Sequence, residues 1–133
     1  MELNKLRDMI HENARAKGFY DAEINGWAKC CNLDFATDVI KHAFFAQKIA
    51  LIHSELSEAL EADRNNRRSS LKNYDETVYA FAQHIKDSVE DELADVIIRI
   101  LDLCGYLGID IQKHVELKMK YNELREYKHG KEY

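Results

Sequence analysis

The chain has 133 residues, of which 46% are hydrophobic and 32% are charged, with a net charge of −5, no proline and five glycines. This length supports a single helical domain over residues 1–133, with a buried core and no room for a second domain. The acidic balance argues against a nucleic-acid polymer as partner, and no uninterrupted apolar stretch is long enough to cross a membrane.

The first predicted elements are two helices separated by an irregular segment. Residues 2–17 are predicted to form a helix that stops at Gly18. Residues 19–36 are predicted to be irregular and contain the single tryptophan, Trp27. The second helix is predicted to begin near Thr37 or Asp38 and to continue to about Arg64.

The second half of the chain is predicted to hold up to three more helices. After a basic loop over residues 65–74, residues 75–86 are predicted to form a short helix. Ser88, followed three residues later by Asp91, is typical of a helix cap, and Gly105 and Gly108 mark the end of that helix. Asp110 is predicted to cap a last helix that runs to about Tyr127. Because no alternating strand pattern occurs, the predicted fold is an all-α bundle of four or five helices.

Two pairs of carboxylates are the main candidates for chemistry. Glu55 and Glu58 are three residues apart on the second predicted helix, and Glu92 and Asp95 are three apart on a later one. This spacing places both members of a pair on one helix face. The predicted apolar neighbours of the acids are Leu51, Ile52, Ala59, Ala62, Val96, Ile98 and Leu103. Carboxylates in such surroundings need compensation, and an all-oxygen set favours Mg²⁺ or Mn²⁺ and a phosphorylated ligand. The alternative is a solvated acidic surface.

The cysteines indicate the compartment. Cys30, Cys31 and Cys104 show no paired spacing, which favours reduced thiols and a cytoplasmic location. The charged first residues also lack the apolar core of a secretory signal.

The residues around the carboxylates resemble a known family. The all-α nucleoside triphosphate pyrophosphohydrolases of the MazG-like group carry E-x-x-E followed by E-x-x-D, matched here by Glu55, Glu58, Glu92 and Asp95. Residues 48–64, 89–111 and 118–133 also look like stretches of a bacterial and phage branch of that family. The resemblance covers roughly residues 40–131. The spacer, residues 59–91, is longer than usual, which leaves the pocket's lid and its base preference open.

The resemblance implies Mg²⁺-dependent hydrolysis of a nucleoside triphosphate between its α and β phosphates, in a homodimer or homotetramer. The four acids would hold the metal, and Glu58 would also act as the base. The substrate-binding candidates are Lys48, Lys118, Asn122, Arg125 and Lys128. Lys48 shares the face of Glu55, and its alternative role is a packed stem with a solvated ammonium. Lys118, Asn122 and Arg125 share a face of the last helix, where a basic series is also favoured by the helix dipole.

Several assignments stay open at this point. Arg99 is four residues after Asp95, which predicts an ion pair within one helix. His11 has no partner that the sequence alone can name. Trp27, Phe44, Phe45 and Tyr79 are possible contacts for a nucleobase. A narrow dUTPase or dCTPase activity and a non-catalytic helical adaptor are the alternative functions.

Overall fold

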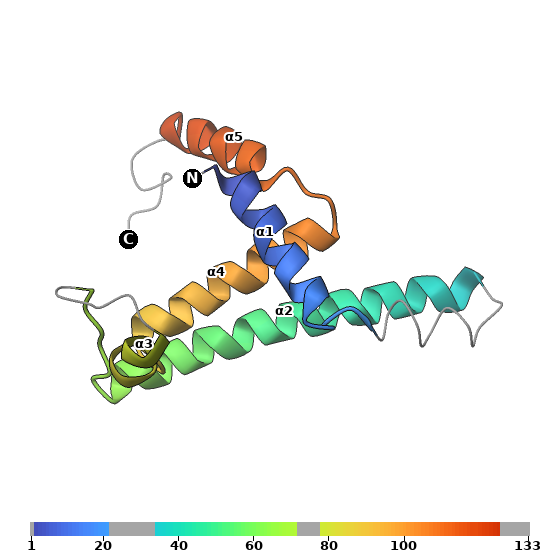
Figure 1. Ribbon diagram of the computed structural model, residues 1–133. Coiled ribbons are helices and arrows are strands. Elements are labelled where there is room, and N and C mark those ends of the chain that lie inside the picture. The colour runs from blue at the N-terminus through green and yellow to red at the C-terminus, as the bar shows by residue number, and fades with distance from the viewer. Residues whose placement is uncertain (1, 22–33, 72–77, 126–133) are drawn as a thin grey trace.

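The computed structural model describes residues 2–21, 34–71 and 78–125, and within them five helices and no strand (Figure 1). The helices are α1 (Leu3–Ala16), α2 (Asp34–Arg64), α3 (Val78–His84), α4 (Val89–Tyr106) and α5 (Ile111–Glu123). The predicted all-α class is therefore confirmed. None of these helices is both long enough and apolar enough to span a membrane.

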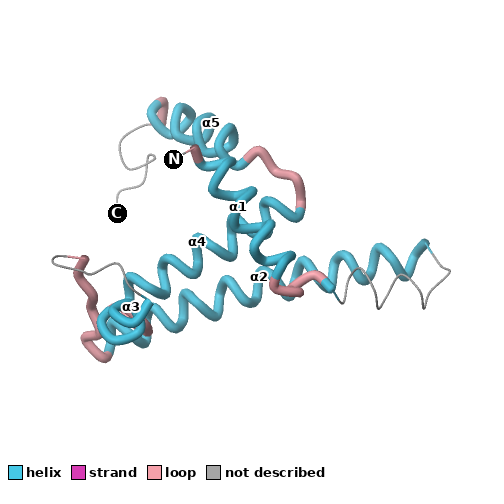
Figure 2. Tube along the Cα trace, viewed as in Figure 1, coloured by secondary structure: helices cyan, strands magenta, loops and turns pink. Residues whose placement is uncertain are grey.

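The antiparallel pair α2–α4 is the central unit of the fold (Figures 1 and 2). Two ion pairs show that the helices are antiparallel. Lys48 of α2 pairs with Asp102 of α4, and Glu55, further along α2, pairs with Arg99, which is earlier on α4. Helix α1 packs across α4, and α5 packs against α1. This arrangement brings the two predicted carboxylate helices side by side.

Local sequence signals set most helix ends. Gly18 takes a positive φ of 82° directly after α1, as expected for a glycine stop. The Ser88 hydroxyl accepts a hydrogen bond from the Asp91 N–H, and the Asp110 carboxylate accepts one from the Lys113 N–H. Both predicted caps are therefore confirmed, because each side chain satisfies a backbone donor that the first helical turn leaves unpaired.

Other boundaries differ from the predictions. Helix α2 begins at Asp34, earlier than the expected Thr37 or Asp38. The described short helix covers Val78–His84, whereas residues 72–77 lie outside the described residues and Lys86 follows the helix. Helix α5 ends at Glu123, short of the expected end near Tyr127. Trp27 also lies outside the described residues, so its predicted role stays a prediction.

Gly105 does not end its helix as predicted. It lies inside the last turn of α4, and the stop is at Gly108, where φ is 65°. A Cβ atom at Gly105 would lie 2.5 Å from Cβ of His11. The glycine therefore serves the close approach of α1 to α4, which no local pattern in the sequence reveals.

The buried core lies mainly between α2 and α4. Ile52, Val96 and Leu103 form one apolar cluster, with Ile49 and Tyr106 packed against it. Ala59 and Ala62 are buried as predicted, whereas Leu51 and Ile98, which were expected to flank the acids on a buried face, are 38% and 44% exposed.

Candidate functional site

Three of the four predicted ligands meet between α2 and α4. Glu55 and Glu58 of α2 and Glu92 of α4 each offer a carboxylate oxygen, and these oxygens lie within 4.8 Å of one another. We call these three residues the carboxylate cluster. Asp95, one turn further along α4, is not part of this group, although its charge is close enough to act on Glu92. The antiparallel packing thus joins two acidic pairs that are far apart in the sequence.

The cluster is buried to different depths. Glu55 and Glu92 are each 6% exposed, whereas Glu58 is exposed and accepts a hydrogen bond from the Ser54 hydroxyl at 3.2 Å. Within the described residues, no hydrogen bond or ion pair reaches the Glu92 carboxylate. No fully buried side-chain oxygen in the described residues lacks a hydrogen-bond partner, so the Glu92 carboxylate still reaches the surface, where a cation could bind it.

The electrostatics of the cluster support the same conclusion. Burial raises the pKa of Glu92 above its ordinary value, and the negative charges of Glu58, Asp91, Glu55 and Asp95 raise it further. Burial likewise raises the pKa of Asp95, helped by Asp91 and Glu55 and partly opposed by Arg99. The folded state therefore holds like charges together at a cost, as functional sites commonly do.

Arg99 pairs across the helices and not along its own helix. Its Nε donates to Oε1 of Glu55 at 2.6 Å, and its Nη2 lies 2.5 Å from the same oxygen. The predicted pair with Asp95 within α4 is therefore wrong. The cause is tertiary, since α2 places the more deeply buried carboxylate of Glu55 within reach of the guanidinium.

A second polar network lies beside the cluster, centred on Asp102. Its carboxylate accepts hydrogen bonds from the Tyr20 hydroxyl at 2.7 Å, from Nδ1 of His11 at 2.8 Å and from Nζ of Lys48 at 3.1 Å. Nδ1 of His11 carries the proton here because an ionised carboxylate can only accept. Burial by itself would raise the pKa of Asp102, but these hydrogen bonds and the Lys48 charge outweigh burial and lower it. The network fastens α1 to α2 and α4.

This network was not predicted from the sequence, which left His11 without a partner. The donors are 54 to 91 residues away from Asp102, so no short spacing could indicate them. The one available signal was the position of Asp102 on the same stripe of its helix as Glu92, Asp95 and Arg99.

Lys48, a predicted substrate contact, lies between the network and a cavity. Its Nζ is 4.2 Å from the centre of the Tyr20 ring and 5.3 Å from that of Phe44, and its side chain is 14% exposed. The cavity has a volume of about 310 Å³. Its charged lining is Lys48, Asp95, Arg99 and Asp102, and its remaining lining is Ile10, Asn13, Ala14, Phe19 and Ile98. The charged lining thus contains two cations and two carboxylates, beside apolar side chains that could contact an organic group.

A further acidic group has a structural explanation. Asp87, Asp91 and Glu92 also present oxygens within 4.8 Å of one another. However, the Asp91 carboxylate accepts from the Asp87 N–H at 2.9 Å, and the Asp87 carboxylate accepts from Nζ of Lys86 at 2.7 Å. These contacts are those of a helix N-terminus and its preceding turn.

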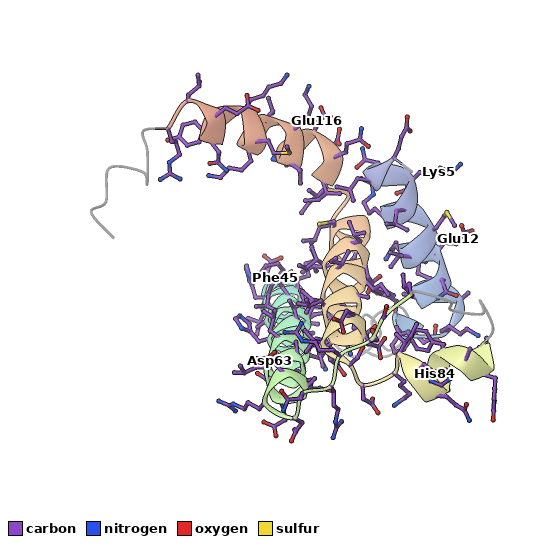
Figure 3. All side chains as sticks on the ribbon, turned by 90° about the vertical axis from the view of Figure 1, so that its left-hand side faces the viewer. Lys5, Glu12, Phe45, Asp63, His84 and Glu116 are labelled. Carbon is purple, nitrogen blue, oxygen red and sulfur yellow. The ribbon has the colours of Figure 1, made fainter. Side chains whose placement is uncertain are left out.

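The predicted basic series lies apart from the cluster of its own chain, and Arg125 follows the end of α5 instead of lying on that helix as predicted. Lys118, Asn122 and Arg125 are exposed, and Lys118 and Arg125 lie near the ring of Tyr121. Figures 1 and 3 both show α5 standing away from the α2–α4 pair, in line with its packing against α1. Lys128 lies outside the described residues. The possible base contacts are also dispersed, because Phe44 packs against Tyr20 and Tyr106 while Phe45 and Tyr79 are exposed.

No protein-family model, curated protein or solved structure matches the chain. The fold and site define an all-α protein with a partly buried carboxylate cluster between two antiparallel helices and a cavity lined by Lys48, Asp95, Arg99 and Asp102.

Proposed function

We propose that this protein is a Mg²⁺-dependent nucleoside triphosphate pyrophosphohydrolase of the all-α, MazG-like kind. It would hydrolyse the bond between the α and β phosphates and release a nucleoside monophosphate and pyrophosphate. The observation that carries the proposal is the carboxylate cluster between α2 and α4, in which Glu55 and Glu92 are buried, Glu58 is exposed and Arg99 pairs with Glu55. The proposed role is removal of unwanted nucleotides from a cytoplasmic pool.

The residues present fit a hard divalent cation. The donors are all carboxylate oxygens, they lie within 4.8 Å of one another, and the Glu92 residue is only 6% exposed. Oxygen-only sites suit Mg²⁺ or Mn²⁺ better than zinc or copper. We propose Asp95 as a further ligand from α4, because the charges of Glu55 and Glu58 already influence its pKa.

The proposed chemistry assigns separate tasks to the side chains. Bound Mg²⁺ would supply positive charge that polarises the phosphoryl oxygens and favours ionisation of water. Glu58 is the exposed member of the cluster and is oriented by Ser54, so it is the proposed base that accepts the proton of the attacking water. The water oxygen bonds to the α phosphorus, the bond from that phosphorus to the bridging oxygen breaks, and pyrophosphate leaves with the electron pair.

The cavity beside the cluster is the proposed place for the rest of the substrate. Lys48 and Arg99 supply positive charge for phosphate oxygens, and Ile10, Ala14 and Phe19 of the α1 region supply an apolar wall for the nucleoside. At about 310 Å³, the cavity is at the lower end of the usual range for small-molecule sites. This size is consistent with partial enclosure of a nucleotide.

We further propose that the chain functions as a homodimer or homotetramer. Leu56 and Leu60 on α2 and Leu93 and Ile97 on α4 are 44–54% exposed. Each pair follows the buried series of its helix by one residue, and in an antiparallel pair of helices this places both pairs on the same side. An apolar surface of this kind favours association. In an oligomer, the basic residues on and after α5 could also reach the carboxylate cluster of a second copy.

Light scattering of the purified chain tests the oligomer. The expected mass is two or four times that of the 15.5 kDa chain. Ile97→Glu is expected to shift the measured mass towards that of a single chain. A chain that stays monomeric at about 100 μM, well above a dissociation constant of about 1 μM, would contradict this part of the proposal. Met9→Glu on α1 is the control, because this side chain is 55% exposed on another helix.

The enzymatic proposal is tested by a panel of ribo- and deoxyribonucleoside triphosphates with Mg²⁺, measuring pyrophosphate and monophosphate. Glu92→Gln is expected to abolish release, whereas Glu12→Gln should leave it unchanged. Glu12 is exposed on the outer side of α1, away from α4 (Figure 3). Release from dUTP or dCTP alone would assign the narrow pyrimidine activity. A folded wild-type chain with no release from any nucleotide would leave the non-catalytic adaptor.

A further inference from the structure

Arg99 is the one cation that forms an ion pair with the carboxylate cluster in the described parts of the chain. Two of its nitrogens, Nε and Nη2, approach the same oxygen, Oε1 of Glu55. The Glu55 side chain is 8% exposed, whereas that of Arg99 is 39% exposed. The pair thus joins a buried anion to a cation that already reaches solvent.

Arg99 and Lys48 both line the cavity, but they are held differently. Lys48 is fixed by the Asp102 carboxylate and by the faces of Tyr20 and Phe44. Among the described residues Arg99 pairs with Glu55, and a guanidinium carries five N–H donors, so donors remain for a second anion. Of the two cations, Arg99 is therefore the one that can change partner at little cost.

We infer that Arg99 is an exchangeable counter-ion of the cluster. Without a divalent cation the guanidinium neutralises Glu55, and when a cation binds it is displaced from that oxygen and turns to the polyphosphate of the substrate. This inference rests on the proposed function. In it, Arg99 couples the binding of the divalent cation to the binding of the polyphosphate. A metal ion without polyphosphate has to compete with the guanidinium, whereas polyphosphate offers the displaced guanidinium a new anion.

The opposite role would be a fixed support. Carboxylates that bind metals are often oriented by a neighbouring donor, and loss of that donor weakens metal binding. Competition is favoured here because both nitrogens converge on one oxygen of a ligand carboxylate and because a guanidinium beside a divalent cation is a like-charge contact. The two roles predict opposite signs for the effect of removing the guanidinium on metal affinity.

The test measures Mn²⁺ binding to the nucleotide-free full chain by the electron paramagnetic resonance signal of free Mn²⁺. Arg99→Gln is expected to bind Mn²⁺ about three- to tenfold more tightly than the wild type, and to gain more in melting temperature on Mn²⁺ addition. Its KM for Mg²⁺-nucleotide is expected to rise. Arg99→Lys keeps the charge and should bind Mn²⁺ as the wild type does. Arg15→Gln, on the exposed side of α1, is the control.

A second measurement needs no substitution that removes the ion pair. The Nε–H resonance of Arg99, assigned by its absence in Arg99→Lys, should exchange faster with water when the wild type is saturated with Mg²⁺. Unchanged or weaker Mn²⁺ binding by Arg99→Gln, or an Nε–H that stays protected, would overturn the inference while leaving Mg²⁺-dependent hydrolysis intact. Absence of Mn²⁺ binding in every variant would overturn the inference and the proposed function together.

Discussion

Glu92→Gln should stabilise the metal-free protein while removing its function. The substitution keeps the shape of the side chain but removes a buried negative charge that lies among Glu55, Glu58 and Asp95. Loss of the charge relieves both desolvation and repulsion. Glu92 forms no ion pair within the described residues, so the neutral amide removes repulsion without breaking an ion pair.

The magnitude follows from the spacing of the carboxylates. The candidate oxygens lie within 4.8 Å of one another, and two unit charges at that upper limit repel by about 3 kcal/mol at an effective dielectric constant of about 20. Because Glu58 is exposed and solvent screens its charge, we expect a net gain of about 1–2 kcal/mol in the free energy of unfolding. For a domain of this size the gain corresponds to a rise of about 4–8 °C in melting temperature.

The assay is urea and thermal unfolding with EDTA and then with Mg²⁺ or Mn²⁺. The wild type should gain stability from the cation by mass action, and Glu92→Gln should lose that gain together with at least about 100-fold of its activity. Glu12→Gln should match the wild type in both measurements. A less stable Glu92→Gln in EDTA, or one that retains the full cation response, would refute the reasoning.

Three further predictions concern pH and the attachment of α1. The pKa values of Glu92 and Asp95 are raised by folding, so the folded state binds more protons than the unfolded state. The stability of the metal-free protein should therefore fall as pH rises from the ordinary carboxyl pKa through the raised values. Urea titrations at a series of pH values measure this slope, and Glu92→Gln should flatten it. Asp102→Asn should cost about 2 kcal/mol in urea unfolding, since the hydrogen bonds to His11, Tyr20 and Lys48 lose their charged acceptor, and an unchanged midpoint would contradict this role. Gly105→Ala should cost about 1–3 kcal/mol in the same assay, because its Cβ would lie 2.5 Å from that of His11, and a neutral effect would show that α1 can move away freely.

The helices and their caps could be predicted because their causes are local. Ser88 and Asp110 satisfy donors three residues ahead, and Gly18 and Gly108 adopt the positive φ that ends a helix. The three-residue spacing of Glu55 and Glu58, and the same spacing at Glu92 and Asp95, likewise depend on helix geometry alone.

The composition of the candidate site depended on packing between helices. Glu55, Glu58 and Glu92 converge while Asp95 faces the cavity, and Arg99 binds Glu55 in preference to the acid on its own helix. These outcomes follow from the rotation and register of α2 against α4, to which the apolar cluster of Ile52, Val96 and Leu103 contributes. Helical periodicity predicts which residues share a face of one helix. It does not predict which residues of another helix will contact that face.

The sequence by itself therefore determined the all-α class, most helix ends and the two acidic pairs, because each of these depends on residues within one or two helical turns. The tertiary structure alone decided the cross-helix pair of Arg99, the Asp102 network with His11 and Lys48, and the need for glycine at position 105. All three require two helices to be brought into contact at one rotation and one register. That choice is made by the packing of the whole domain, so no short segment of the chain contains it.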